Sequence, residues 1–225
     1  MLIVLEGLDG AGKSTQLKLA TDYIISKGRE VEFLHFPRYS APVFGDLIGK
    51  FLRGEFGSLE QVHPQLVALL FAEDRRDAAG IVREWLGRGH VVLLDRYVYS
   101  NIAFQCAKMN SRKESDDLRD WIIDVEYSKY GIPKPDLNLF LDVPIEFVDS
   151  KLKSARETED REYLNGKADI HEADIAFQKN VRRLYLEQCE LDSGFKRIDC
   201  GDADGHMLPA GSIFAKIKSE IDKLI

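Results

Sequence analysis

Residues 7–15 of this chain, GLDGAGKST, have the types and spacing that are needed to hold a chain of phosphate groups. The stretch fits the pattern GxxxxGK[ST], in which glycines let backbone N–H groups come close to phosphate oxygens. It follows the apolar run at residues 2–5 and precedes a helical pattern, which is the context that this chemistry requires. The sequence therefore predicts a polyphosphate site near the start of the chain.

The residues of this loop have distinct expected tasks. Lys13 is expected to reach the β- and γ-phosphates of ATP, and the Ser14 hydroxyl is expected to ligate Mg²⁺. The N-terminal end of the following helix adds a positive dipole at the same place. Gly10, in the middle of the loop, has no side chain that could add charge. The predicted ATP-binding residues are Gly7, Leu8, Asp9, Gly10, Ala11, Gly12, Lys13, Ser14 and Thr15.

Such a loop leaves three classes open: a small-molecule kinase, a regulatory GTPase, and an ATPase module of a larger machine. A GTPase needs a guanine-reading NKxD motif after a later strand, and the chain has none. An LSGGQ-like signature of transporter ATPases is also absent from the sequence. The stretch LLDRY, in which Arg96 follows Asp95 at once, favours a kinase.

Two arginines follow predicted strands and can meet at one crevice. Arg38 lies in FPRY after the second strand, and Arg96 lies in DRY after the third. In open α/β sheets the ligand crevice lies beyond the carboxyl ends of the strands, where the phosphate loop also lies. Guanidinium groups suit a second phosphate that must be held in line with the donor. We therefore predict that Lys13, Arg38 and Arg96 are catalytic.

The elements that must position these residues alternate along the chain. Apolar runs predict strands at 2–5, 31–36, 90–95, 137–142 and 196–200. Amphipathic patterns predict helices at about 14–27, 42–53, 64–87, 98–108, 116–130, 145–157, 173–192 and 211–224. Nearly continuous apolar strands separated by helices indicate a mostly parallel sheet that is covered on both faces. We expect one α/β domain over residues 1–225.

Composition narrows the possible partners. The net charge is −7 and the pI is about 5.3, which argues against nucleic-acid binding and against an anionic membrane. The three cysteines have no metal-binding spacing, and no stretch reaches the roughly 20 apolar residues of a membrane span. These features predict a reduced, cytoplasmic protein with neither nucleic acid nor membrane as partner.

The segment 154–174 is dense in charge and poor in large apolar residues. Two interpretations stay open from composition alone. It is either a solvated surface connection or a mobile lid whose arginines, Arg156 and Arg161, close over the reactants.

Five stretches together resemble the thymidylate kinase family. They are EGLDGAGKSTQ, FPRYS, LLFAEDRR, DRYVYSNIAFQ and PDLNLFLDV, in this order, and the resemblance covers about residues 2–200. It implies transfer of the γ-phosphate of ATP to dTMP with Mg²⁺, in a three-layer αβα P-loop kinase fold with a five-stranded parallel sheet and a mobile lid. It also implies a homodimer. The alternatives are a kinase for another nucleotide or deoxynucleoside, and a non-catalytic ATP-binding module.

The resemblance also implies roles for single residues. Phe71 would stack on thymine, Arg75 would donate to its O4, and Asn101 would accept from N3–H and donate to a carbonyl. Phe104 would lie near the sugar, and Asp9 would lie near the sugar and the metal. The full expected dTMP-binding set is Asp9, Phe36, Arg38, Tyr39, Phe71, Arg75, Arg96, Tyr97, Ser100, Asn101 and Phe104.

Two features of the chain bear on its lid. With Gly10 in the phosphate loop, the chain resembles the bacterial-type branch of the family, in which lid arginines supply the missing charge. Arg156 and Arg161 are therefore added to the expected catalytic residues, together with Asp9. His171 occupies a position where the resemblance implies tyrosine in many relatives, so an aromatic contact from the lid to the nucleotide is not implied for this chain. His171 either stacks on the nucleotide, hydrogen-bonds to it or has no role there, and we do not expect it to be catalytic.

Overall fold

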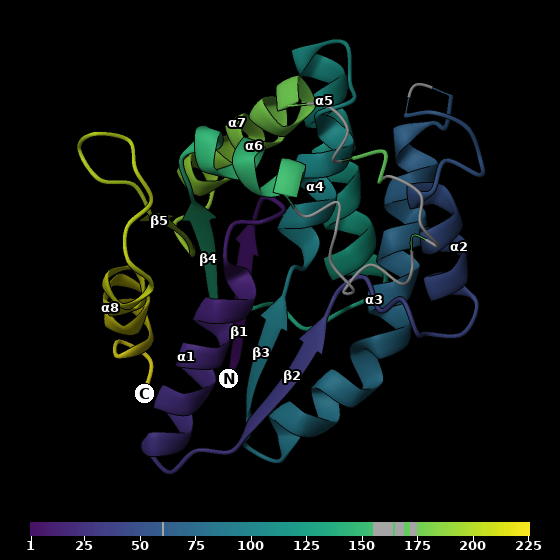
Figure 1. The fold of residues 1–225 in the computed structure, drawn as a ribbon. Helices are drawn as coiled ribbons and strands as arrows, with labels where there is room; N and C mark the ends of the chain where they lie inside the picture. The colour runs from purple at the N-terminus through teal and green to yellow at the C-terminus, as the bar shows by residue number, and fades with distance from the viewer. Residues whose placement is uncertain (60, 155–163, 165–168, 172–174) are drawn as a thin grey trace.

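In a computed structural model, residues 1–59, 61–154, 164, 169–171 and 175–225 are described, and five strands form one sheet (Figure 1). The strands are β1 (Leu2–Gly7), β2 (Val31–His35), β3 (Val91–Asp95), β4 (Leu137–Asp142) and β5 (Phe195–Asp199). Their order is β2-β3-β1-β4-β5, and every neighbouring pair is parallel. The predicted five-stranded parallel sheet is therefore confirmed.

Helices cover both faces of this sheet, which gives the predicted three layers (Figure 1). On one face α1 contacts α8 and the strands β1, β2 and β3; on the other, α3, α4 and α7 contact the sheet, with α5 packed against α4. The helices are α1 (Lys13–Ser26), α2 (Phe44–Leu52), α3 (Pro64–Gly87), α4 (Val98–Cys106), α5 (Arg112–Ile123), η1 (Asp124–Lys129), α6 (Ile145–Ser154), α7 (Ile175–Leu191) and α8 (Ala210–Ile221).

The three central strands explain the apolar runs in the sequence. Every residue of β1, β3 and β4 is buried, whereas the edge strand β2 is only half-buried. Strands that are covered on both faces need apolar side chains on both sides, which produces runs rather than alternation. No helix in the described part of the chain combines the length and the apolar character needed to cross a membrane.

One predicted helix is divided in the structure. The pattern at 116–130 becomes α5, which starts earlier at Arg112, followed by a turn of π-helix, η1. The earlier start has a local cause: the Ser111 side chain accepts a hydrogen bond from the Glu114 backbone N–H at 3.2 Å, as in a capping box. The wider turn of η1 turns Glu126 into the protein interior, where it is fully buried. π-turns of this kind often occur at functional sites.

Candidate active site

The phosphate loop joins β1 to α1 at the carboxyl end of the sheet. Gly10 and Gly12 have φ angles of 74° and 80°, a left-handed conformation that glycine adopts without strain. At Gly7 an added Cβ would lie 3.3 Å from the Ala11 Cβ and 3.4 Å from the Leu141 carbonyl oxygen, so a side chain there would crowd its neighbours. The loop is therefore shaped by backbone requirements that only its glycines meet.

Lys13 opens α1 and turns back over the loop. Its Nζ donates to the Leu8 carbonyl at 3.1 Å and lies 4.0 Å from Oδ1 of Asp95, the last residue of β3. Burial, together with Arg96, lowers the pKa of Lys13. Burial alone would raise the pKa of Asp95, but Lys13 and the ring of His35, whose Nδ1 lies 3.3 Å from Oδ2, lower it. Lys13 and Asp95 therefore lie beside the loop, at the place where a bound phosphate chain would approach.

Asp95 is a functional candidate that the sequence analysis used only to distinguish classes. Its Oδ1 is buried and has no hydrogen-bond partner among the described residues. A carboxylate at the end of a strand beside a phosphate loop commonly holds Mg²⁺ together with the loop serine. Ser14, Asp9 and Asp95 all offer hard oxygen ligands, so the residues present fit this ion. The signal was available in the sequence, as an acid at the end of the run HVVLLD.

Arg96 is held in a strained backbone conformation at the centre of the site. Its φ of 66° is unusual for a residue with a side chain, and such strain is often found at functional sites. The guanidinium donates to Asp9 Oδ1 at 2.6 Å, to the Ser100 hydroxyl at 3.1 Å and to the Tyr185 hydroxyl at 3.4 Å. Asp9 and neighbouring groups hold the pKa of Arg96 above its usual value, although burial opposes the charge. The arginine is a fixed positive charge beside the phosphate loop.

Glu6 holds the backbone around Arg96 in place, and it was not among the residues predicted from the sequence. It is fully buried in β1, and its carboxylate accepts from the backbone N–H groups of Tyr97 at 2.9 Å and Ser100 at 3.1 Å. It also accepts from the hydroxyls of Ser100 at 2.5 Å and Tyr185 at 3.1 Å. Burial raises the pKa of Glu6. An acid within the apolar run LIVLEG was the signal that could have found it.

Arg38 is paired with two aspartates of α3, Asp74 and Asp77. Its Nε donates to Asp74 Oδ1 at 2.9 Å, and its Nη2 donates to the Asp74 carbonyl at 3.0 Å and to Asp77 Oδ2 at 2.6 Å. Arg38 is not among the residues that line a cavity with Arg96, and its expected role at the acceptor phosphate stays a prediction. Asp77 is half exposed, so an acceptor phosphate would compete with that carboxylate for the guanidinium.

A cavity runs from Asp9 and Arg96 into the protein. Its wall contains every residue of the predicted dTMP-binding set except Arg38. The lining residues are Asp9, Phe36, Pro37, Tyr39, Leu52, Phe71, Arg75, Arg96, Tyr97, Ser100, Asn101, Phe104, Gln105, Asp169 and His171. Residues from six separate parts of the chain are thus brought to one cavity.

Polar groups at the inner end of this cavity are fixed by Glu126. Arg75 donates to its carboxylate through Nε at 2.5 Å and Nη2 at 2.7 Å, and both residues are buried. Asn101 Nδ2 donates to Glu126 Oε1 at 3.0 Å and to the Ala68 carbonyl at 2.9 Å. Asn101 Oδ1 is buried without a partner among the described residues. Asn101 Oδ1 can therefore accept from a ligand here, while its amide group donates to protein acceptors in this structure, and the expected donation to a base carbonyl stays a prediction.

Comparison with known proteins decides the family. A sequence model described as "Thymidylate kinase" matches residues 5–203. The chain belongs to the thymidylate kinase family. It is 34% identical over 189 residues to a thymidylate kinase of Mycobacterium tuberculosis, covering 83% of this chain and 85% of the relative. It is 34% identical over 184 residues to a human thymidylate kinase, covering 82% and 74%. The resemblance found in the sequence, and with it the prediction of a kinase of this family, is confirmed.

A solved structure supports the fold. The thymidylate kinase of Candida albicans matches with a TM-score of 0.72, covering 99% of this chain and 91% of that chain, at 24% sequence identity. At this level of identity the match shows the fold alone, and that fold is the predicted P-loop kinase fold.

The family resemblance placed two arginines in a lid, and both lie outside the described residues. Arg156 and Arg161 fall within 155–163, so their expected roles stay predictions. Residues 169–171 are described and line the cavity through Asp169 and His171. The ring of His171 therefore lines the cavity of this member of the thymidylate kinase family.

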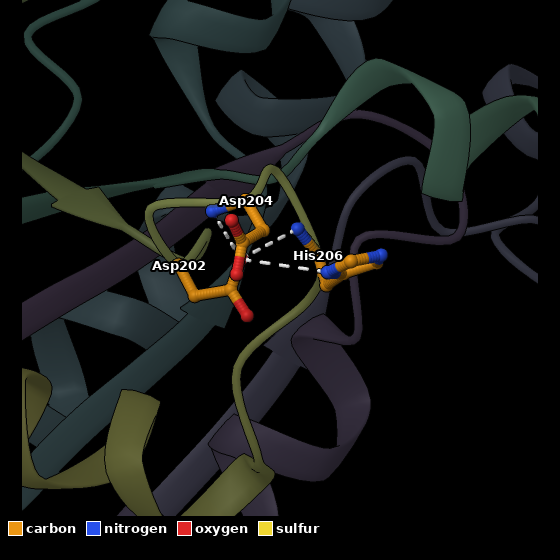
Figure 2. Close-up of side chains that lie close together, drawn as sticks. All are labelled: Asp202, Asp204 and His206. Atoms are coloured by element: carbon orange, nitrogen blue, oxygen red, sulfur yellow. Dashed lines mark hydrogen bonds and ion pairs between the residues drawn. The ribbon is translucent and has the colours of Figure 1, made fainter.

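A second group of acids lies in the loop after β5, close to the phosphate loop of this kinase. Asp202, Asp204 and His206 gather there within reach of one another (Figure 2). Asp202 Oδ1 accepts from the backbone N–H groups of Asp204 at 3.0 Å and His206 at 2.8 Å. All three residues are exposed, and the carboxylate of Asp202 stabilises its own turn. The cluster therefore has a structural explanation and identifies no metal centre.

Proposed function

We propose that this chain transfers the γ-phosphate of ATP to dTMP and so forms dTDP. One observation carries the proposal: a single cavity extends from Arg96 beside the phosphate loop to the buried pair of Arg75 and Asn101. A nucleoside monophosphate has a phosphate at one end and a base at the other. The cavity offers positive charge at the first end and fixed hydrogen-bonding groups at the second.

On the donor side, the residues of the phosphate loop, 7–15, bind ATP. Lys13 contacts the β- and γ-phosphates, while Ser14, Asp9 and Asp95 hold Mg²⁺, in part through water. The ion, when bound, neutralises charge on the phosphate oxygens. The buried Asp95 Oδ1 without a described partner supports this arrangement.

On the acceptor side, no general base is needed. The attacking group is an ionised phosphate oxygen, so the residues position it and neutralise charge. Arg96 holds the dTMP phosphate beside Lys13, and Arg38 joins it when it exchanges Asp77 for that phosphate. The lid supplies Arg156 and Arg161, which compensate for the missing side chain at Gly10.

Base selection depends on two groups that Glu126 orients. Arg75 donates to O4 of thymine, and Asn101 Oδ1 accepts from N3–H. Cytosine has an amino donor in place of O4 and no hydrogen on N3, so it leaves both protein groups unpaired. Phe71 stacks on the base, and Phe104 lies along the sugar.

An assay of coupled ADP release tests the proposal with dTMP, dUMP, dCMP, AMP and thymidine as acceptors. We expect dTMP to give the highest kcat/KM, and dCMP to be used very poorly. Preference for thymidine would identify a deoxynucleoside kinase, and preference for another monophosphate would identify a different nucleotide kinase. Failure with every acceptor, while ATP still binds, would favour a non-catalytic ATP-binding module.

The remaining expectations concern assembly and location. We propose a homodimer, which is supported by the exposed apolar side chains Leu66 and Ile81 on α3 and Phe33 on the edge strand β2. Light scattering during size-exclusion chromatography gives the mass directly, and a monomer at micromolar concentration would refute it. We also propose a cytoplasmic location, where ATP and dTMP are available.

A further inference from the structure

His171 occupies an aromatic pocket on the wall of the cavity. Its ring centroid lies 5.2 Å from that of Phe104, 5.5 Å from that of Phe51 and 5.6 Å from that of Phe177. The residue is only 5% exposed. Phenylalanine would suit three aromatic neighbours without burying a polar nitrogen, so packing alone does not explain a histidine here.

Hydrogen bonds to the backbone of residues 170 and 171 hold the segment that carries the imidazole. The His171 backbone N–H donates to Asp169 Oδ1 at 2.8 Å, and its carbonyl accepts from Gln178 Nε2 on α7 at 2.8 Å. The neighbouring Ile170 N–H donates to the Leu52 carbonyl at the end of α2 at 3.0 Å. Because the segment is attached on both sides, the ring is held against the cavity.

The Nε2 atom of His171 is buried and has no hydrogen-bond partner among the described residues. A buried polar atom without a partner is unfavourable for folding, and such atoms call for an explanation. Asn101 Oδ1, which lines the same cavity, is in the same state. A ligand that satisfies both atoms would remove both costs.

The neighbours of His171 indicate which part of the ligand it meets. The Arg96 guanidinium lies 5.1 Å from the Phe104 ring centroid, and His171 packs against the same ring. Arg96 marks the phosphate end of the cavity, and Asn101 marks the base end. Only the sugar of a nucleotide lies between a phosphate and a base.

The imidazole carries no charge that would favour a phosphate over a hydroxyl as its partner. Burial, with the positive charges of Lys108 and Arg96, lowers the pKa of His171 well below its usual value. The ring is therefore neutral at physiological pH, and a neutral imidazole exchanges a hydrogen bond with a hydroxyl in either tautomer.

We propose that His171 Nε2 hydrogen-bonds a hydroxyl of the acceptor's sugar and so determines sugar specificity. This inference rests on the proposed function, because it needs a nucleotide in the cavity. The hydroxyl is the 3′-hydroxyl in dTMP; in a ribonucleotide the 2′-hydroxyl is a second candidate.

Two variants and three ligands test the inference. His171→Phe keeps the aromatic packing and removes the nitrogen, and His171→Gln restores a polar atom near the position of Nε2. Dissociation constants without ATP, and kcat and KM with ATP, are measured for dTMP, its 3′-deoxy analogue and ribothymidine 5′-monophosphate. Thermal unfolding of each variant controls for folding.

We expect His171→Phe to weaken dTMP binding about tenfold, the effect of losing one hydrogen bond of about 1.4 kcal/mol, with kcat within twofold. The 3′-deoxy analogue should bind the parent and His171→Phe equally well, and His171→Gln should recover most of the loss. A tenfold effect confined to the ribonucleotide would also support the inference and would assign the bond to the 2′-hydroxyl.

Equal losses for dTMP and its 3′-deoxy analogue, or no loss with any ligand, would overturn the inference. If His171→Phe does not fold, the three ligands are compared on the parent and on His171→Gln instead. A parent that binds the 3′-deoxy analogue as well as dTMP, and that shows no preference between deoxyribose and ribose, refutes the inference. If the parent phosphorylates dTMP while the inference about His171 is refuted, the proposed function still stands. A parent that neither binds nor phosphorylates dTMP refutes both.

Discussion

The donor and acceptor halves of this site are built on different principles. The donor half is one contiguous stretch, residues 7–15, and its shape follows from the backbone conformations of its glycines. The acceptor half gathers side chains from Asp9, the segment after β2, the helices α2, α3 and α4, and the segment 169–171 around one cavity. Buried carboxylates hold these side chains in place: Glu6 beneath Arg96, Asp74 beside Arg38, and Glu126 beneath Arg75 and Asn101.

This difference has an energetic consequence. A backbone loop loses little stability when one of its side chains is removed, because its shape does not depend on that side chain. A buried ion pair costs several kcal/mol when one partner is lost, because the other charge is left unpaired. Removal of a side chain from the donor half should therefore affect chemistry alone, whereas loss of a buried carboxylate beneath the acceptor half should affect both chemistry and folding.

The largest expected effect tests the donor half. Lys13→Ala should lower kcat/KM for ATP at least ~100-fold, or ~2.7 kcal/mol, because a positive charge on the transferring phosphate is lost. The melting temperature should stay close to that of the parent, because burial outweighs the long contact with Asp95 in lowering the pKa of Lys13, so the charged side chain does not stabilise the fold on balance. Lys18→Ala, on the same helix but exposed and paired only with Asp22 among the described contacts, is the matched control and should keep full activity. Near-normal turnover by Lys13→Ala would remove the loop from the mechanism.

A second prediction concerns the charge that Gly10 does not supply. The double variant of Arg156→Ala and Arg161→Ala should reduce kcat at least ~30-fold, since an arginine at a phosphoryl-transfer site commonly contributes more than this. dTMP affinity should change little, and the single variants show which arginine matters more. Arg112→Ala, an exposed arginine on α5, serves as control in the same steady-state assay. If the double variant stays within about threefold of the parent, the lid only covers the site.

The third prediction tests Glu126, the buried carboxylate that holds Arg75 and Asn101 in the acceptor half. Glu126→Gln leaves Arg75 buried without its counter-charge, which should cost about 3 kcal/mol of unfolding free energy. KM for dTMP should rise about tenfold, because Arg75 and Asn101 lose their common anchor. Glu84→Gln, which breaks the exposed pair with Arg88, should cost less than about 1 kcal/mol. Denaturant unfolding of both variants gives the comparison, and equal costs would contradict the distinction drawn between the two halves.

The residues of the donor half could be predicted from the sequence, whereas the buried acids that hold the acceptor half in place could not. The loop motif is local, so its glycines, Lys13 and Ser14 are legible in one window of residues. The sheet and its flanking helices also followed from apolar runs. Glu126 was missed because its burial depends on a π-turn, and nothing in the stretch DVEYSK separates it from a solvated acid. The pairing of Arg38 with Asp74 joins residues 36 apart in the chain, and no local pattern contains it.

The fourth prediction concerns how α2 positions the loop around Arg38. A Cβ added at Gly45 would lie 2.4 Å from the Tyr39 carbonyl oxygen and 2.5 Å from that of Arg38, so this backbone must shift. Gly45→Ala should cost about 1–3 kcal/mol of stability through overpacking. We also expect KM for dTMP to rise several-fold, since Arg38 and Tyr39 move together. Gly211→Ala, a helical glycine in α8 with no atom within 4 Å of an added Cβ, should be neutral in both measurements.

The smallest expected effect is electrostatic and lies at the edge of the acceptor cavity. The Nζ of Lys108 donates to Gln105 Oε1 at 2.8 Å and lies 4.9 Å from the Phe51 ring centroid. Burial lowers the pKa of Lys108 to about 7, against a usual 10.5, although Asp169 opposes the shift. Between these two pH values the unfolded chain binds more protons than the folded one, so this lysine makes stability rise with pH.

Replacing Lys108 by methionine should therefore remove a cost that is largest at low pH. We expect Lys108→Met to be more stable than the parent at pH 7, and the gain should shrink as the pH approaches 10. Urea unfolding of both proteins at pH 7, 8.5 and 10 measures the difference, and contributions of other groups cancel between them. Lys113→Met, in which the replaced lysine is fully exposed on α5, should show no such change with pH. A constant difference between Lys108→Met and its parent would mean that Lys108 keeps its proton in the folded protein throughout this range.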